Sequence, residues 1–286
     1  MENDKKIIAC VDQSRYASPV ADYAAWASRV TQAPLTLLHV LDRHPERGPG
    51  DDHSGAIGVD AQENLVAKLA ADEAARTAAA REQGRVFLDG LRERVQGVGV
   101  TSVEVRQRHG ALEETLAEQE PDIRLLVLGR AWAADSVGGG LGGQVERVVR
   151  ALHVPVLIVP DAFRAPQRAL IAFDGGHAAR RAVDMVAASP LFASMAICLF
   201  MAGKASGDAF GQLDWAEGVL RGAGRAVQRI EKPGDVAGSI LATLDEESID
   251  LLVMGAFGHS ALRSLVFGSK TAELLRAVRV PALLLR

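Results

Sequence analysis

The chain contains two copies of one sequence unit. The run Leu-Leu-Val-Leu-Gly that ends at Gly129 matches Leu-Leu-Val-Met-Gly, which ends at Gly255, and a Val-Pro step follows in each copy, at Pro155 and Pro281. Both pairs are 126 positions apart, with no gap between them. A fixed offset of this kind indicates a duplication, so we expect one folding unit to occur twice along the chain.

The starts of the two copies match at a larger offset. Each copy begins with an apolar run that ends in aspartate, at Asp12 and at Asp174, which are 162 positions apart. The first copy is therefore longer by 162 − 126 = 36 residues, and the extra length follows Leu41.

The extra length divides into a loop and a helix. Residues 44–59 are rich in Gly, Pro, Asp and His, which predicts a loop. Residues 61–95 are rich in Ala, Arg and Glu, which predicts a long helix, and we expect a break near Gly84 or Gly90 because glycine is a poor helix former.

Short apolar runs alternate with helical patterns in each copy, which is typical of βα units and a parallel sheet. We predict strands at 7–11, 35–40, 101–106, 125–128 and 156–159, and again at 169–173, 196–200, 226–230, 251–253 and 282–285. The predicted fold is α/β and Rossmann-like, with two tandem doubly wound five-stranded parallel sheets. Residues 161–167 form the expected linker, which gives domains at 1–160 and 161–286.

The end of the second copy carries a pattern suited to binding phosphate. A buried strand run ends at Gly255, and Gly258, Gly268 and Ser269 follow it with the spacing Gly-x2-Gly-x9-Gly-Ser before a helical pattern. Glycines let the main chain approach an anion closely. The free N–H groups and the positive dipole end of the following helix attract negative charge, and the serine adds a hydroxyl donor. This pattern predicts a phosphate-binding loop.

This run, with the aspartate before its strand and the Val-Pro step after its helix, resembles the nucleotide-binding signature of the universal stress protein family. The resemblance extends over the whole chain as a tandem pair, and it implies bound ATP, with or without Mg²⁺. It implies that Asp174 and main-chain groups at Met201 hold the nucleoside at the carboxyl ends of the strands. Gly255, Gly258, Gly268 and Ser269 would surround the phosphates, with Lys270 and Thr271 beside them at the helix start. The main chain of Met254, at the end of its strand, would be a further contact.

The family's usual dimer contact, across the edge of the last strand, suggests how the two copies meet. A bare edge rich in Val and Leu invites pairing. We therefore expect residues 156–159 and 282–285 to join the copies into an intramolecular pseudo-dimer, to which a homodimer of whole chains could be added.

Each candidate residue has a plainer interpretation that the sequence leaves open. Asp174 can cap the helix expected near His177, and Gly255 with Gly258 can serve a tight turn alone. Ser269 can be an N-cap and Lys270 a solvated lysine, since the Walker pattern is missing. The side chains of Met201 and Met254 are expected in the core, so only their main chain is proposed as a contact. His177, His259 and Arg263 are expected to be surface residues without a catalytic role.

The first copy departs from the pattern at two positions. Trp132 stands where the second copy has Gly258, and Gly143 stands where it has Ser269. We expect Trp132 to obstruct the cleft, which makes the first copy a degenerate partner domain.

Composition excludes several classes of protein. The formal net charge is −4, with no basic excess to indicate binding to nucleic acid or to a membrane surface. The polar first residues and the lack of a long apolar segment predict a cytoplasmic protein. Cys10 and Cys198 lie in apolar runs and are expected to be buried thiols. The seven histidines show no paired ligand spacing, so no metal site is predicted.

The leading hypothesis is a non-catalytic regulatory or stress-response module that binds adenine nucleotide in its second domain and acts through unidentified protein partners. One alternative is a slow ATPase or a phosphoryl or nucleotidyl transferase, which would need an activated nucleophile or a carboxylate pair for metal. The other is a nucleotide-free scaffold that binds protein partners or another small ligand, an interpretation favoured by the inserted loop and helix.

Overall fold

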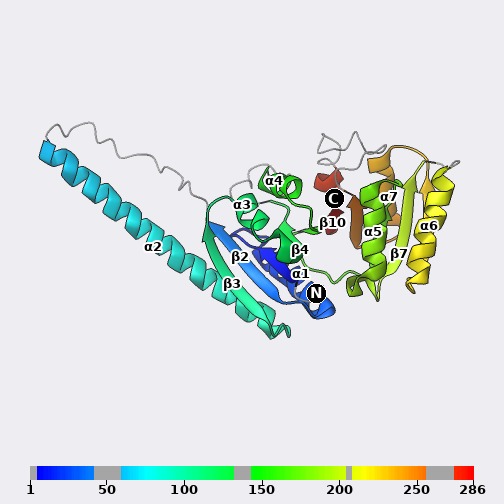
Figure 1. Ribbon diagram of the computed structural model, residues 1–286, viewed down its shortest axis with the longest axis horizontal. Coiled ribbons are helices and arrows are strands. Elements are labelled where there is room, and N and C mark those ends of the chain that lie inside the picture. The colour runs from blue at the N-terminus through cyan, green and yellow to red at the C-terminus, as the bar shows by residue number, and fades with distance from the viewer. Residues whose placement is uncertain (1–4, 42–58, 132–142, 204–207, 256–273) are drawn as a thin grey trace.

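A computed structural model describes residues 5–41, 59–131, 143–203, 208–255 and 274–286. The strands form one ten-stranded sheet in the order β3-β2-β1-β4-β5-β10-β9-β6-β7-β8. Figure 1 shows this sheet running through both halves of the chain, with helices on its two faces.

All ten predicted strands are present, and their ends differ from the prediction by at most three residues. The first half contains β1 (Lys6–Cys10), β2 (Leu35–Leu41), β3 (Val103–His109), β4 (Ile123–Gly129) and β5 (Val156–Val159). The second half contains β6 (Arg168–Ala172), β7 (Ala196–Ala202), β8 (Val227–Lys232), β9 (Leu251–Gly255) and β10 (Ala282–Leu285). Neighbours within each half are parallel, as expected of a doubly wound sheet.

The two halves join through β5 and β10, which confirms the predicted contact. These strands pair antiparallel, with Leu157 opposite Leu283. Arg130 adds a contact across the halves, because its Nη2 donates a hydrogen bond to the carbonyl of Val280 at 3.1 Å. Because the central pair is antiparallel, the strands of the two halves run in opposite directions. The carboxyl ends of the first-half strands therefore lie on the same side of the sheet as the amino ends of the second-half strands.

Helices cover both faces of the sheet, as a buried parallel sheet requires. One face packs against α1 (Ala17–Thr31), α2 (Val59–Gly97), α5 (His177–Ala188) and α6 (Asp208–Gly222). The other packs against α3 (Leu112–Ala117), α4 (Gly143–Ala151) and α7 (Val236–Glu246). Two short 3₁₀ turns, η1 (Glu120–Asp122) and η3 (Pro190–Phe192), lead into β4 and β7. The apolar runs supply both layers because successive residues face opposite sides: Leu125 and Val127 of β4 belong to one core, and Leu126 and Leu128 to the other.

The inserted helix α2 is continuous over 39 residues, so the predicted break at Gly84 or Gly90 is wrong. Gly84 is buried where α2 crosses the sheet, and a Cβ there would lie 2.2 Å from the amide nitrogen of Gln107 on β3. This glycine therefore allows close packing of a straight helix. Before Gly84, Figure 1 shows α2 (cyan) extending well away from the rest of the molecule.

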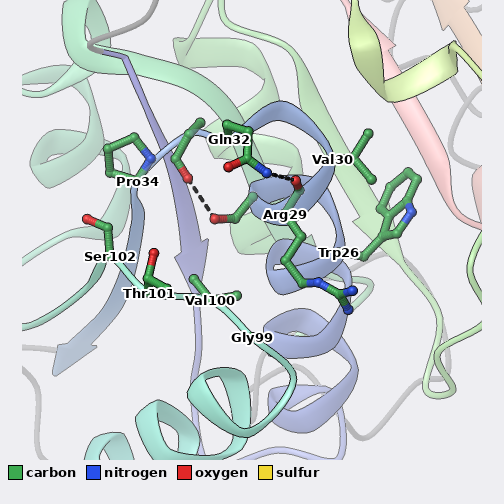
Figure 2. A pocket seen from close by; sticks show the side chains of 11 residues that line it. Trp26, Arg29, Val30, Gln32, Pro34, Gly99, Val100, Thr101 and Ser102 are labelled. Carbon is green, nitrogen blue, oxygen red and sulfur yellow. Dashed lines mark hydrogen bonds between the residues drawn. The ribbon is translucent and has the colours of Figure 1, made fainter.

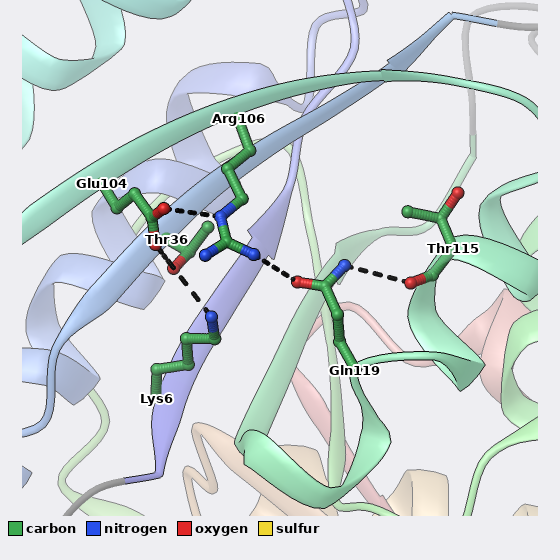
Figure 3. A network of polar contacts seen from close by, with 6 residues as sticks. All are labelled: Lys6, Thr36, Glu104, Arg106, Thr115 and Gln119. Atoms are coloured by element: carbon green, nitrogen blue, oxygen red, sulfur yellow. Dashed lines mark hydrogen bonds and ion pairs between the residues drawn. The ribbon is translucent and has the colours of Figure 1, made fainter.

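A network of polar side chains links β3 to α3 and to the start of β1 (Figure 3). Arg106 on β3 donates from Nε to Glu104 at 2.6 Å and from Nη1 to the side-chain oxygen of Gln119 at 3.0 Å. Lys6 lies 4.0 Å from the same Glu104 carboxylate. The charges of Lys6 and Arg106 are therefore both paired with the carboxylate of Glu104.

Candidate functional site

The candidate site lies where the strand order of the second half reverses. The chain leaves β6 toward β7 on one side and returns to β9 on the other, and Ala172 of β6 pairs with Met254 of β9. Asp174 follows β6, and Gly255 is the last residue of β9. Ligands of open α/β sheets bind in the crevice at such a reversal point, so these two predicted residues lie at the expected place.

Asp174 holds the turn that leads into α5. Its Oδ1 accepts a hydrogen bond from the N–H of Gly176 at 2.9 Å. Gly176 itself is the N-cap residue of α5, and no side chain caps the helix there. His177 is exposed as the first residue of α5, which confirms it as the polar residue that opens this helix. The Asp174 carboxylate thus lies beside the positive end of the helix dipole.

Gly255 is required by the close approach of α5. A Cβ at this position would lie 2.8 Å from the Cβ of Ala178 and 3.1 Å from the main-chain nitrogen of Ala179. The first turn of α5 therefore packs directly on the end of β9. This contact explains the glycine by packing, and it also brings the N–H groups that begin α5 to the reversal point.

The contacts that surround the turn after Asp174 were not predicted from the sequence. Gly175 has φ of 76°, and the side chain of Gln212 on α6 occupies the space where a Cβ would point. Arg180 donates from Nε to the carbonyl of Gly175 at 3.2 Å, and its guanidinium lies 4.9 Å from the centre of the Trp215 ring. The Gly-Gly pair after Asp174 was a local signal for an unusual turn, but nothing in the spacing pointed to partners on α6.

The two methionines of the prediction have core side chains, as expected. Met201 on β7 and Met254 on β9 are both buried. The main-chain groups of Phe200 face β6, because Phe200 accepts a hydrogen bond from the N–H of Phe173. Successive residues alternate, so those of Met201 face β8 and those of Ala202 face the β6 side again. A nucleoside contact at Met201 or Met254 stays a prediction.

The remaining phosphate-loop residues lie outside the described part of the chain, namely Gly258, Gly268, Ser269, Lys270, Thr271, His259 and Arg263. The end of the helix predicted after Gly268 is described. Residues 274–277 are helical, in line with the helical pattern expected there, and Leu275 and Val278 are buried.

The equivalent place in the first half is built differently. Asp12 is buried after β1, and its Oδ1 accepts a hydrogen bond from the hydroxyl of Ser14 at 2.6 Å. Tyr16, which matches Ala178 at the offset of 162, is buried against Gly129, and a Cβ on that glycine would lie 2.5 Å from the Cβ of Tyr16. An aromatic ring therefore stands where the second half has a methyl group. Trp132, the expected obstruction, lies outside the described residues.

Buried titratable groups nearby are kept neutral. His39, at the position that matches Met201, donates a hydrogen bond from Nδ1 to the carbonyl of Val11 at 2.8 Å, and burial lowers the pKa of His39. Both cysteines are buried, as predicted. Burial raises the pKa of the Cys10 thiol and raises the pKa of Cys198 to about 11. Neither thiol is suited to act as a nucleophile at neutral pH.

A hollow of about 410 Å³ lies at the other end of the first-half strands (Figure 2). It is formed by the end of α1 with Arg29, the turn at Pro34 and residues 99–102 before β3. Because ligands of such sheets bind at the carboxyl ends of strands, this hollow is separate from the candidate site.

In the described residues, no helix is long and apolar enough to cross a bilayer.

Comparison with known proteins places the chain in a family. The family model described as "Universal stress protein family" matches residues 4–160 and 199–286. The universal stress protein Slr1230 of Synechocystis sp. is 31% identical over 286 residues, covering 99% of this chain and 100% of that protein. A second protein of the same organism, universal stress protein Sll1654, is 30% identical over 158 residues, covering 54% of this chain and 85% of that protein.

Solved structures support the same fold. A universal stress protein from Archaeoglobus fulgidus aligns with a TM-score of 0.71 and 17% identity, covering 100% of this chain and 97% of that one. A protein from Pseudomonas aeruginosa, described as a putative universal stress protein, aligns with a TM-score of 0.59 and 18% identity, covering 99% and 94%. With the duplicated sequence and the paired sheets described above, these findings show that the chain belongs to the universal stress protein family.

Proposed function

We propose that residues 161–286 form an ATP-binding domain that regulates other proteins without catalysis, and that residues 1–160 form its degenerate partner domain. The observation that carries the proposal is the meeting of Asp174, the start of α5 and Gly255 at the reversal point of the sheet.

Each of the three features suits one part of the nucleotide. A carboxylate at this place can accept hydrogen bonds from ribose hydroxyls. The positive end of the α5 dipole favours an anion, and the glycine-rich segment that follows β9 in sequence, from Gly255 to Ser269, supplies further main-chain N–H groups. Mg²⁺ would enter with the phosphates, because the described residues include no group of three His, Cys, Asp or Glu side chains that could bind it.

Binding without catalysis fits the chemistry of the described residues at this edge. His177 is exposed and has no hydrogen-bond partner among them, so it is not held as a general base. The first half is the weaker candidate for ATP because Tyr16 takes the place of Ala178.

Isothermal titration of the full chain with ATP tests the proposal. We expect saturable binding that Asp174→Asn weakens at least about tenfold, because a charged acceptor becomes a neutral one. Asp12→Asn is the matched control, since it makes the same change at the equivalent position of the first half. A titration of the wild-type chain without heat at millimolar ATP, or equal losses in the two variants, would contradict the proposal. Phosphate release should stay at the level of the buffer blank.

A scaffold function is a second candidate, and α2 favours it. The part of α2 before Gly84 extends from the molecule, and its described alanines from Ala70 to Ala79 are exposed. Deletion of residues 59–81 distinguishes the candidates, because it should leave ATP affinity unchanged while it removes any partner that binds this helix.

A further inference from the structure

We propose that a second small-molecule site lies between the two halves and binds a dianion that carries phosphate or carboxylate groups. A cleft of about 1,030 Å³ opens where the amino ends of β1, β4 and β5 face α5. Its size is that of sites for small metabolites. Its walls come from both halves, so a bound molecule would touch each of them.

The first-half wall presents two positive charges that have no partner within the described part of the chain. Lys5 and Arg124 lie at the starts of the adjacent strands β1 and β4, and both are half-buried. Among the described residues neither forms a hydrogen bond or an ion pair through its side chain. The next residue, Lys6, differs because it is engaged by Glu104 (Figure 3). Two neighbouring cations in a partly desolvated cleft repel one another, and an anion bound between them removes that cost.

A local irregularity in the sheet provides independent support. Lys6 pairs with Ile123, but the next residue, Ile7, pairs with Leu125. Arg124 is therefore an extra residue in β4, as in a β-bulge. Bulges of this kind commonly re-aim a side chain beside a functional site. Here the bulge sets the orientation of Arg124 independently of the regular alternation along β4.

The acidic groups of the cleft compensate this positive charge only in part, because Lys5, Arg124 and Arg181 outnumber Glu120 and Asp184. Glu120 is already engaged, because one of its oxygens accepts a hydrogen bond from the main-chain N–H of His153 at 2.5 Å and lies 3.6 Å from the ring Nδ1. On the opposite wall, Arg181 donates from Nη1 to the carbonyl of Arg286, which leaves its other N–H groups for a ligand. Asp184, one turn further along α5, can accept a hydrogen bond from a hydroxyl group of the ligand.

The arrangement of the charged side chains in the cleft indicates which class of ligand it would bind. Cations stand on both walls, and the lining also includes apolar surface from Met185, Val154 and Pro121. This arrangement suits a small dianion with a charged group at each end and an apolar or hydroxylated body. The residues differ from those proposed for ATP, so the inference does not depend on the proposed function.

Titration of the full chain with pyrophosphate and with glutarate tests the site and separates its two chemistries. We expect at least one probe to bind, and Lys5→Gln combined with Arg124→Gln to weaken it at least tenfold. The matched control is Lys68→Gln combined with Arg29→Gln, which removes the same charge at exposed positions (Figure 2 shows Arg29) and should leave the affinity unchanged. The preferred probe identifies phosphate or carboxylate recognition.

Two further measurements separate binding in this cleft from binding at the ATP site and from a loss of folding. Pyrophosphate can also occupy an ATP site, so the titration is repeated at saturating ATP, where the cleft should still bind. Ala188 is an exposed residue of α5 that lines the cleft, and Ala188→Trp should block binding by filling the space. This variant replaces the Lys5 and Arg124 double variant as the test if the double variant does not fold. The proposal is overturned if neither probe binds the wild-type chain, or if the cleft variants bind as the wild type does.

Discussion

Replacing Gly255 by alanine tests how closely α5 packs on the candidate site. The new methyl group would lie 2.8 Å from the Cβ of Ala178, too close for two carbon atoms, so the first turn of α5 has to move by a few tenths of an ångström. Overpacking of this kind costs about 1–3 kcal/mol. The lower freedom of alanine in the unfolded chain returns about 0.5–1 kcal/mol. The difference between these two effects centres on a net loss of about 1 kcal/mol in the free energy of unfolding, and we expect severalfold weaker ATP binding with it.

Urea unfolding followed by circular dichroism measures the stability change, and isothermal titration measures the affinity. Gly218→Ala is the control, since this exposed glycine lies inside α6 with nothing within 4 Å of its missing Cβ. That change should stabilise the chain by about 0.5–1 kcal/mol. Ala178→Gly should rescue Gly255→Ala, with a coupling of at least about 1 kcal/mol in the double-mutant cycle. A Gly255→Ala protein as stable as the wild type, with no coupling to position 178, would refute the packing argument.

Two further predictions concern the first half and the junction. Because burial lowers the pKa of His39, the unfolded chain takes up a proton below about pH 6.5 that the folded chain does not, so stability should fall from pH 7.5 to pH 5.5. His39→Gln should flatten that slope in urea unfolding, and an unchanged slope would count against it. Leu283→Ala empties a fully buried position opposite Leu157 and should cost about 2–5 kcal/mol. Hydrogen exchange should then speed up in β4 as well as in β9, and acceleration confined to β9 would show that the halves unfold separately.

The sequence predicted the sheet well because its signals are local and repeated. The inner strands are covered on both faces, so they appear as continuous apolar runs, as at Leu125 to Leu128, whereas the edge strands β3 and β8 are partly exposed and contain polar residues. The duplication then placed the second set of strands from the first. The joining of β5 to β10 followed from the family's usual contact and from two short apolar edges that needed partners.

The features that were missed depend on contacts between distant elements. Glycine at position 84 predicts a helix break, but its neighbours are Gln107 and His39, which the sequence does not place beside it. The packing of Tyr16 on Gly129 joins residues far apart in the chain, as does the stacking of Arg180 on Trp215. No periodicity within one helix or strand carries that information. The sequence could place Asp174 and Gly255 at the reversal point because Gly255 ends an apolar strand run and Asp174 follows one.

The antiparallel joint between β5 and β10 restricts how this protein can transmit a signal. Many two-domain proteins close around a ligand by rotating about a flexible connection. Here such a rotation would tear main-chain hydrogen bonds in the middle of a sheet and expose buried leucines. Any response to a bound molecule must therefore be carried by elements that can shift while the central strands stay fixed, chiefly the surface helices. The two domains should behave as one rigid platform whose outer layer changes.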